Sequence, residues 1–334
     1  MLQPASRILG MGHYLPPTVR TNADLEKMVD TSDAWIIERT GIRQRHIADA
    51  DMASSDMATE AARSALAQAE LTARDIDMII VATITPDMPM PATAVFVQKK
   101  LGAGNCPAFD LSAACAGFVF GLSIADQFIR SGAVRHVLVV GVEMLSKVVD
   151  WTDRTTCVLF GDGAGAVVLG PAAGAVAQGR ARGILSTKLK TDGSLAGSLN
   201  IPGGGSLQPQ SSAVLEQLGH KIHMRGQDIF KVAVKNLQSS SQAALDDLGM
   251  TGADLEWICP HQANLRIIDL AVAKLGVARE KMLSNIDRVG NTSSASIPIL
   301  LDESVRAGKV RPGDRVLMCA LGAGVSWGSA VVTI

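Results

Sequence analysis

One cysteine of the chain, Cys115, stands where a short buried strand gives way to a helix. Residues 105–111 are mostly apolar, and beyond Cys115 apolar side chains recur at helical spacing, at Val119, Leu122, Ala125 and Phe128. Backbone N–H groups and the positive end of the helix dipole stabilise an anion at such a position, so we expect a thiolate to form there readily. The small neighbouring residues leave room for a substrate. Because a lone cysteine is commonly buried and inert, this context alone leaves a structural role open.

Two polar residues in the second half of the chain have types that could assist a thiol nucleophile. His261 directly follows a buried strand predicted over residues 256–260, and the carboxyl ends of strands are where α/β sheets carry functional residues. Asn291 lies in a turn after Gly290. Papain-like hydrolases also combine a thiol, an imidazole and a carboxamide, so the residue types alone do not decide the reaction.

Three features favour acyl transfer with carbon–carbon bond formation over hydrolysis. Cys115 lies at an apolar helix start, which suits a long-lived thioester. Asn291 follows a glycine in a turn, where its amide can donate to a substrate oxygen. No Asp or Glu lies near His261 in the sequence to orient its imidazole. In addition, a glycine-flanked turn follows a buried strand near the C-terminus, and the N–H of Ala323 there could form an oxyanion hole with that of Cys115.

The elements that would position these residues occur twice in the chain. Three segments of the first half recur in order in the second: 65–80 as 244–259, 135–140 as 315–320 and, more weakly, 165–169 as 329–333. The first two offsets are 179 and 180 residues, whereas the third is 164, which requires a shorter connection before the last strand. We therefore predict two copies of one α/β unit, residues 1–174 and 175–334, related by a pseudo-twofold axis.

The duplication also predicts where the candidate functional residues come together. Shifting Cys115 by 179 or 180 residues leads to Ser294 or Ala295, at the start of a second helix. A pseudo-twofold axis would bring the two helix starts together from opposite halves. Cys115, His261 and Asn291 are therefore expected to converge on one crevice.

The composition is that of an α/β enzyme with much buried sheet. Of 334 residues, 47% are apolar and 19% charged, and the net charge of −1 gives no global signal for nucleic acid or an anionic membrane. The five cysteines are widely spaced and form no metal-binding pair, which fits reduced thiols. No signal segment and no apolar run of membrane-spanning length are evident, so we expect a cytoplasmic enzyme.

Four motifs together resemble those of one enzyme family. In order along the chain they are residues 110–118, 161–166, 261–267 and 289–298. They closely resemble β-ketoacyl-[acyl carrier protein] synthase III of the thiolase-like superfamily, at the family's approximate spacing. The Cys-His-Asn set is similar to that of the initiating, rather than the elongating, condensing enzymes. The resemblance implies a thiolase-like fold with αβαβα layers, a homodimer, and a reaction without metal or cofactor.

The resemblance also implies a ping-pong reaction that starts fatty-acid chains. Cys115 would take an acyl group from acyl-CoA, after which a malonyl group on acyl carrier protein binds. His261 and Asn291 would hydrogen-bond the malonyl thioester carbonyl and stabilise the enolate formed as CO2 leaves, and the carbanion then attacks the acyl thioester. Ala323 stands where many family members have glycine; its N–H donor is retained, so only the backbone angle there differs.

Four residues match family positions that bind CoA. Trp35 and Arg154 would sandwich the adenine, Arg39 would contact a phosphate, and Asn264 would lie near the pantetheine arm. A flat ring stacks on a guanidinium, and arginine pairs with phosphate through two hydrogen bonds, so the chemistry agrees. Without the resemblance, a Trp35 that packs against its helix and solvated arginines would be the simpler interpretation.

Three more residues match family positions with weaker signals. Met90 would close the far end of the acyl pocket from the partner subunit, although ordinary core packing is an equal alternative. Lys231 and Arg266 would lie on a basic face that meets the acidic carrier protein, although surface cations are usually only solvated.

Other functions remain open at this stage. A condensing enzyme or acyltransferase of secondary metabolism would use a different primer or acceptor, and a thioester hydrolase could use the same Cys-His-Asn set. The intact set disfavours a non-catalytic carrier-binding partner. The glycine-rich residues 161–166 run straight into a strand and are not a dinucleotide fingerprint. His220 and His223 show no metal-binding spacing.

Overall fold

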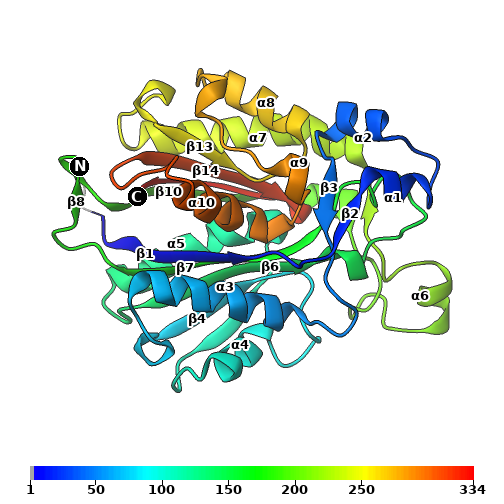
Figure 1. Ribbon diagram of the computed structural model, residues 1–334, viewed down its shortest axis with the longest axis horizontal. Helices are drawn as coiled ribbons and strands as arrows, with labels where there is room; N and C mark the ends of the chain where they lie inside the picture. The colour runs from blue at the N-terminus through cyan, green and yellow to red at the C-terminus, as the bar shows by residue number, and fades with distance from the viewer. Residues whose placement is uncertain (1–3) are drawn as a thin grey trace.

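Two β-sheets, one from each half of the chain, form the frame of the molecule (Figure 1). The computed structural model describes residues 4–334. The first sheet has the strand order β1-β7-β6-β4-β5 and the second has the order β10-β15-β14-β13. Their strands are β1 (Ser6–Tyr14), β4 (Met78–Ala82), β5 (Ala108–Leu111), β6 (Val137–Met144), β7 (Asp162–Pro171), β10 (Gly183–Thr191), β13 (Trp257–Pro260), β14 (Arg315–Gly322) and β15 (Ser326–Thr333).

The two sheets repeat one topology. The central pair is parallel in each, β4 with β6 and β13 with β14, and the strands that follow, β7 and β15, are antiparallel to β6 and β14. In the second sheet a single bridge between Ile258 and Met282 stands where β5 pairs with β4 in the first. The predicted duplication is therefore present in the strand order as well as in the sequence. The division at residues 174 and 175 stays a prediction.

Helices lie between the sheets and on both outer faces, so the layers are αβαβα, as expected (Figure 1). The central layer contains α5 (Gly117–Arg130) and α10 (Ser296–Arg306). On the outside, α3 (Ser54–Ala69) and α4 (Thr93–Leu101) cover the first sheet, and α7 (Gly226–Asp246) and α8 (Leu265–Lys274) cover the second. None of the helices within the described residues is long and apolar enough to cross a membrane.

The remaining elements are short. They are β2 (Val19–Thr21), α1 (Asn22–Glu26), α2 (Asp33–Thr40), β3 (Gln44–His46), β8 (Val176–Ala177), β9 (Arg180–Ala181), β11 (Leu199–Asn200), α6 (Ser212–Glu216), β12 (His223–Met224) and α9 (Ile286–Val289). Single 3₁₀ turns connect several of them. Figure 1 shows α6 projecting from one side of the layered body.

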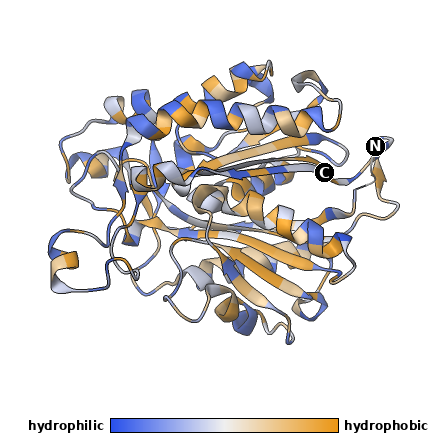
Figure 2. Ribbon diagram, turned by 180° about the vertical axis from the view of Figure 1, so that it is seen from behind, coloured by the Kyte–Doolittle hydropathy of each residue, from blue (hydrophilic) through white to orange (hydrophobic). Residues whose placement is uncertain are grey.

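Alternate side chains of the central strands enter different cores, which explains their continuous apolar runs. In β6, Val137 and Val139 pack against the helices between the sheets, whereas Leu138 and Val140 pack under α3 and α4. Figure 2 shows the resulting apolar colour along these strands. Because both faces of these strands are buried, the strands are held firmly in position, and so are the residues at their ends.

The same small 3₁₀ turn, with the same side-chain hydrogen bond, precedes a central parallel strand in each half of the chain. The backbone N–H of Thr72 donates to the carboxylate of Asp75 over 2.8 Å, ahead of β4. The N–H of Thr251 donates to Asp254 over the same distance, ahead of β13. Both pairs sit at the 179-residue offset predicted for this segment, so the two halves share local hydrogen bonds as well as topology.

All but the first of the glycine-rich residues 161–166 are themselves part of a strand and do not merely lead into one. β7 begins at Asp162 and runs alongside α10. A Cβ at Gly165 would lie 2.7 Å from the backbone nitrogen of Ile299, so the glycine lets helix and strand approach closely.

Candidate active site

Cys115 lies in a tight turn between the first sheet and the central helix layer. It is the middle residue of a 3₁₀ turn over Ala114–Ala116, and α5 begins only at Gly117. The end of β14 packs directly against this turn, because a Cβ at Gly322 would lie 2.5 Å from the Cys115 nitrogen. The sequence prediction of a strand-to-helix position is thus correct, with one extra turn between the two elements.

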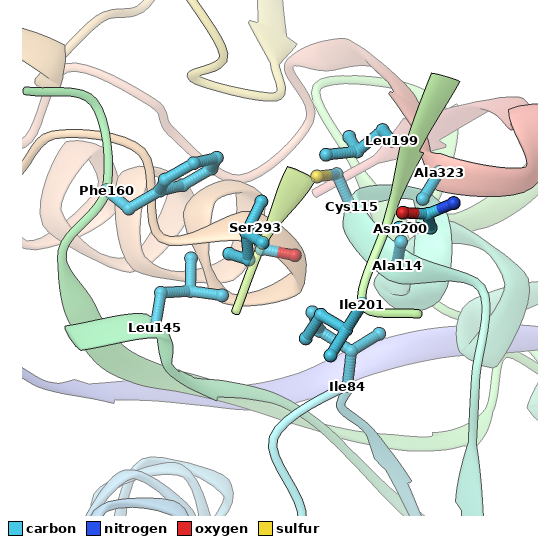
Figure 3. A pocket seen from close by; sticks show the side chains of 11 residues that line it. Ile84, Ala114, Cys115, Leu145, Phe160, Leu199, Asn200, Ile201, Ser293 and Ala323 are labelled. Carbon is cyan, nitrogen blue, oxygen red and sulfur yellow. The ribbon is translucent and has the colours of Figure 1, made fainter. Parts of the chain in front are cut away.

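The Cys115 sulfur faces a cavity of about 210 Å³ that is almost wholly apolar (Figure 3). Figure 3 shows the sulfur directed into this space, with Leu145 and Phe160 on the opposite side. Besides Cys115, polar side chains reach the wall only from Asn200 and Ser293 among the residues that line it. Ala323 also lines this cavity, which places both proposed oxyanion-hole residues at one cavity.

The thiol is harder to ionise than the sequence suggested. Burial raises the pKa of Cys115 to about 12; the Ser293 hydroxyl opposes this rise and the nearby Glu143 carboxylate adds to it. The expectation of a readily formed thiolate is therefore wrong for the free protein, because the sulfur lies in a 3₁₀ turn before α5 and faces apolar side chains.

His261 directly follows β13, which pairs with β14, the strand whose end packs against the Cys115 turn. Its backbone N–H donates to the Cys319 carbonyl of β14 over 2.8 Å. Its Nδ1 lies 2.6 Å from the Ser296 hydroxyl, at the first residue of α10. Burial lowers the pKa of His261 to about 3, so the ring is neutral at physiological pH.

Asn291 is held by backbone contacts to the loop beside the cavity. Its N–H donates to the Leu159 carbonyl over 2.9 Å, and it forms a bridge with Phe160, which lines the cavity. Its Oδ1 accepts the Ser293 N–H over 2.9 Å. Nδ2 has no hydrogen-bond partner within residues 4–334, so this orientation leaves the amide as a free donor.

The turn before α10 and the first residue of α10 bring these residues together. Ser293 shares the cavity wall with Cys115, and the 3₁₀ turn over Ser293–Ala295 packs against the Cys115 turn. Asn291 contacts the first residue of that turn, and His261 contacts Ser296 immediately after it. His261 and Asn291 do not themselves line the cavity of Figure 3.

The sequence analysis missed two buried residues beside the site, Ser296 and Glu143. Glu143 on β6 is completely buried and accepts hydrogen bonds from Thr85 Oγ1 at 2.8 Å, Ser293 Oγ at 3.0 Å and the Ile84 N–H at 3.1 Å. Burial raises the pKa of Glu143 to about 7. An acidic residue inside an apolar strand was the available signal for Glu143, whereas Ser296 had none beyond its place in a motif.

The predicted CoA residues cluster on the surface around α2. The guanidinium carbons of Arg39 and Arg154 lie 5.5 and 5.1 Å from the ring centroid of Trp35. Asn264 joins this cluster: its Nδ2 donates to the Arg39 carbonyl over 2.9 Å, and its Oδ1 caps α8 by accepting the Arg266 N–H. Aromatic, cationic and amide groups are thus assembled, although the Asn264 side chain already has structural hydrogen bonds.

The three weaker predictions fall on exposed residues. Met90 is 83% exposed in the segment between β4 and α4, and it does not line the cavity of the single chain. Ile84, at the start of the same segment, does. Lys231 and Arg266 are exposed on α7 and α8, which pack together, and the Arg266 guanidinium lies 5.8 Å from the Phe230 ring.

Comparisons with known proteins agree with this geometry. The family model for 3-oxoacyl-[acyl-carrier-protein] synthase III matches residues 109–193, and the model for its C-terminal part matches residues 245–334. The β-ketoacyl-[acyl-carrier-protein] synthase III of Caldanaerobacter subterraneus subsp. tengcongensis is 50% identical over 98% of this chain and 97% of its own length.

Solved structures of similar enzymes have the same fold. The 3-oxoacyl-[acyl-carrier-protein] synthase III of Aquifex aeolicus VF5 superposes with a TM-score of 0.89, at 44% identity, over 98% of this chain and all of that one. The priming β-ketosynthase of the R1128 polyketide biosynthetic pathway gives a TM-score of 0.90 at 38% identity, over 99% of this chain and 97% of that chain. Because full-length relatives share about half of their residues with it, this chain belongs to the 3-oxoacyl-[acyl-carrier-protein] synthase III family, whose members are condensing acyltransferases with the thiolase-like fold.

Proposed function

We propose that the protein condenses an acyl-CoA primer with malonyl-[acyl carrier protein] and thereby starts fatty-acid chains. The products are 3-ketoacyl-[acyl carrier protein], CoA and CO2. The observation that carries this proposal is the position of the Cys115 sulfur in an almost wholly apolar cavity, beside a turn that holds a neutral imidazole and a free amide donor. An apolar cavity protects a thioester from water and accepts an alkyl chain.

In the first half-reaction Cys115 becomes acylated. Its sulfur attacks the acyl carbon of acyl-CoA and loses its proton, the bond from that carbon to the CoA sulfur breaks, and CoA leaves as the thiol with the proton. The backbone N–H groups of Cys115 and Ala323 are assigned to the oxyanion of the tetrahedral intermediate. A thiol with a raised pKa favours the acylated form, because the buried site disfavours its thiolate as a leaving group.

In the second half-reaction His261 and Asn291 stabilise an enolate. The bond from the malonyl α-carbon to its carboxylate breaks, CO2 leaves, and the electron pair moves into the enolate. The Nε2 of His261 and the Nδ2 of Asn291 donate hydrogen bonds to the enolate oxygen. The α-carbon then attacks the acyl carbon, the bond to the Cys115 sulfur breaks, and the released thiolate takes up a proton from solvent to restore the thiol.

The remaining predicted residues are assigned to substrate and partner contacts. Trp35, Arg39 and Arg154 bind the nucleotide part of CoA, and Asn264 lies along the pantetheine path. When the adenine of CoA stacks on Trp35, it displaces the Arg154 guanidinium that covers the ring in the free protein. These side chains combine the aromatic face and the positive charge that a nucleotide with phosphates requires.

Protein partners occupy two exposed regions. Lys231 and Arg266 form a basic surface suited to an acidic carrier protein. Met90, exposed in the single chain, reaches the acyl cavity of a second copy in a homodimer and limits the length of the primer. Its exposure of 83% leaves the side chain available for such a contact.

Product analysis tests the proposed function directly. Purified protein is incubated with acyl-CoA and malonyl-[acyl carrier protein], and the carrier-bound products and released CO2 are quantified. We expect one CO2 for each 3-ketoacyl thioester. Free acid would identify a thioester hydrolase, and acylated carrier protein without CO2 a plain acyltransferase; either would contradict the proposal.

A further inference from the structure

Within residues 4–334 a serine hydroxyl, and no carboxylate, holds the ring of His261. Nδ1 of His261 lies 2.6 Å from Oγ of Ser296, and both residues are buried, at 4% and 2% exposure. Among residues 4–334 this is the only hydrogen bond of the imidazole. Nε2, the other ring nitrogen, has no protein partner in that range and is left for a substrate.

The hydrogen bonds of Ser296 decide which ring nitrogen carries the proton. Its Oγ accepts the N–H of Gln262 over 3.4 Å, so one of its lone pairs is used. Its single proton has one acceptor within the described part of the chain, Nδ1 of His261. Because buried donors are almost always paired, the hydroxyl donates to Nδ1. A neutral imidazole that accepts at Nδ1 carries its proton at Nε2.

This arrangement is the opposite of the one in a hydrolytic triad. There a carboxylate accepts the Nδ1 proton, which leaves Nε2 unprotonated to act as a base towards the nucleophile. Here the partner of Nδ1 is a donor, so Nε2 presents a proton and no lone pair. The burial that lowers the pKa of His261 to about 3 keeps the ring in this neutral form.

We propose that Ser296 is a positioning residue that fixes His261 as the Nε2–H tautomer, so that His261 acts as a hydrogen-bond donor in condensation and not as the base for Cys115. This inference rests on the proposed function. His261 and Asn291 then have matching hydrogen bonds. Nδ1 of His261 and Oδ1 of Asn291 each accept a hydrogen bond from a residue at the start of α10 or in the turn before it, and the donor nitrogen of each side chain is left free. Two free donors suit one developing enolate oxygen.

The test separates the two half-reactions in the variant Ser296→Ala. Ser304→Ala is the matched control, because Ser304 lies on the same helix, is also buried, and donates only to the Leu300 carbonyl over 2.7 Å. Acylation of Cys115 is followed by mass spectrometry, condensation by CO2 release, and the ring tautomer by 15N NMR with labelled histidine. Ser296→Cys, which keeps a weak donor of similar size, serves if the alanine variant is unstable.

We expect Ser296→Ala to acylate at the wild-type rate, to condense about 10- to 100-fold more slowly, and to lose its single tautomer. Ser296→Cys should fall between it and the wild type, and Ser304→Ala should match the wild type throughout. The proposal is overturned if the wild-type ring carries its proton on Nδ1, if Ser296→Ala condenses normally, or if acylation falls as much as condensation. Since the NMR measurement needs no turnover, it tests the tautomer even if the wild type makes no 3-ketoacyl product.

Discussion

Ala114 and Ser293 share a left-handed backbone conformation, with φ angles of 46° and 49°, although they lie 179 residues apart in the chain. Each opens a 3₁₀ turn that precedes a central helix, and the two turns pack against each other. Such angles are uncommon outside glycine and cost of order 1–3 kcal/mol. The same strained turn thus carries Cys115, the proposed nucleophile, in one half of the molecule and contacts Asn291 and His261 in the other.

Loss of a single enolate donor should slow condensation without preventing acylation. Asn291→Asp retains the oxygen that accepts the Ser293 N–H but cannot donate, so it should keep the turn and lower kcat for condensation by about 10²- to 10³-fold. His261→Ala should have an effect of similar size. Rapid-quench measurement of acyl-enzyme and of CO2 checks both. Normal condensation by Asn291→Asp would remove Asn291 from the enolate role.

The pKa of Cys115, raised to about 12, predicts how the thiol is alkylated. The rate of reaction with iodoacetamide should rise about tenfold for each pH unit from 7 to 10, without a plateau, because the thiolate fraction grows over that whole range. Glu143→Gln removes the negative charge that raises this pKa, so it should speed alkylation above about pH 7, where Glu143 is ionised. Glu60→Gln, on the exposed face of α3, is the control and should have no effect. A plateau near neutral pH in the wild type would contradict the raised pKa.

Glu143 should also make the folding stability depend on pH. Its folded-state pKa of about 7 exceeds the ordinary value of 4.5, so the folded protein binds the proton more tightly than the unfolded chain. The corresponding stability is complete below about pH 4.5 and is lost as pH rises through 7. Relative to Glu143→Gln, the wild type should lose roughly 2–3 kcal/mol of unfolding free energy between pH 5 and 8, measured by urea denaturation. A constant difference between the two proteins over this range would show that Glu143 does not titrate there.

The cluster of Trp35, Arg39 and Arg154 should affect the binding of CoA substrates and little else. Trp35→Ala and Arg154→Ala each remove a stacking partner worth about 1 kcal/mol, which should raise KM for acyl-CoA about fivefold and leave kcat nearly unchanged. Steady-state kinetics at saturating malonyl-[acyl carrier protein] measure both constants. Arg63→Ala, an exposed arginine on α3, is the matched control. Equal KM values in all three variants would place the nucleotide elsewhere.

The pattern of apolar residues and the internal repeat predicted the two sheets well, because both features of the sequence reflect which residues are buried. β4 and β13 have both faces covered, so their continuous apolar runs are visible in the sequence, and their common offset revealed the two halves. The same offset located the second helix start near Ser294, which the structure places at the turn before α10.

The sequence could not predict features that depend on long-range contacts. The pKa of Cys115 follows from the apolar cavity and from Glu143, 28 positions further along the chain, and not from the helix start beside it. Ser296 matters only because the end of β13 brings His261 to its hydroxyl. The φ angle of Ala114 is imposed by packing between the halves, since alanine alone does not favour it.

The most direct test of the account is intact-protein mass spectrometry after incubation with acyl-CoA thioesters from acetyl to dodecanoyl. We predict a single stable adduct that is absent in Cys115→Ala, with a mass that names the preferred primer; short acyl groups would agree with fatty-acid initiation. The partly exposed Cys106 provides an internal comparison, because acylation there would persist in Cys115→Ala. No adduct with any of these thioesters, or an adduct that survives the loss of Cys115, would contradict the acyl-enzyme mechanism.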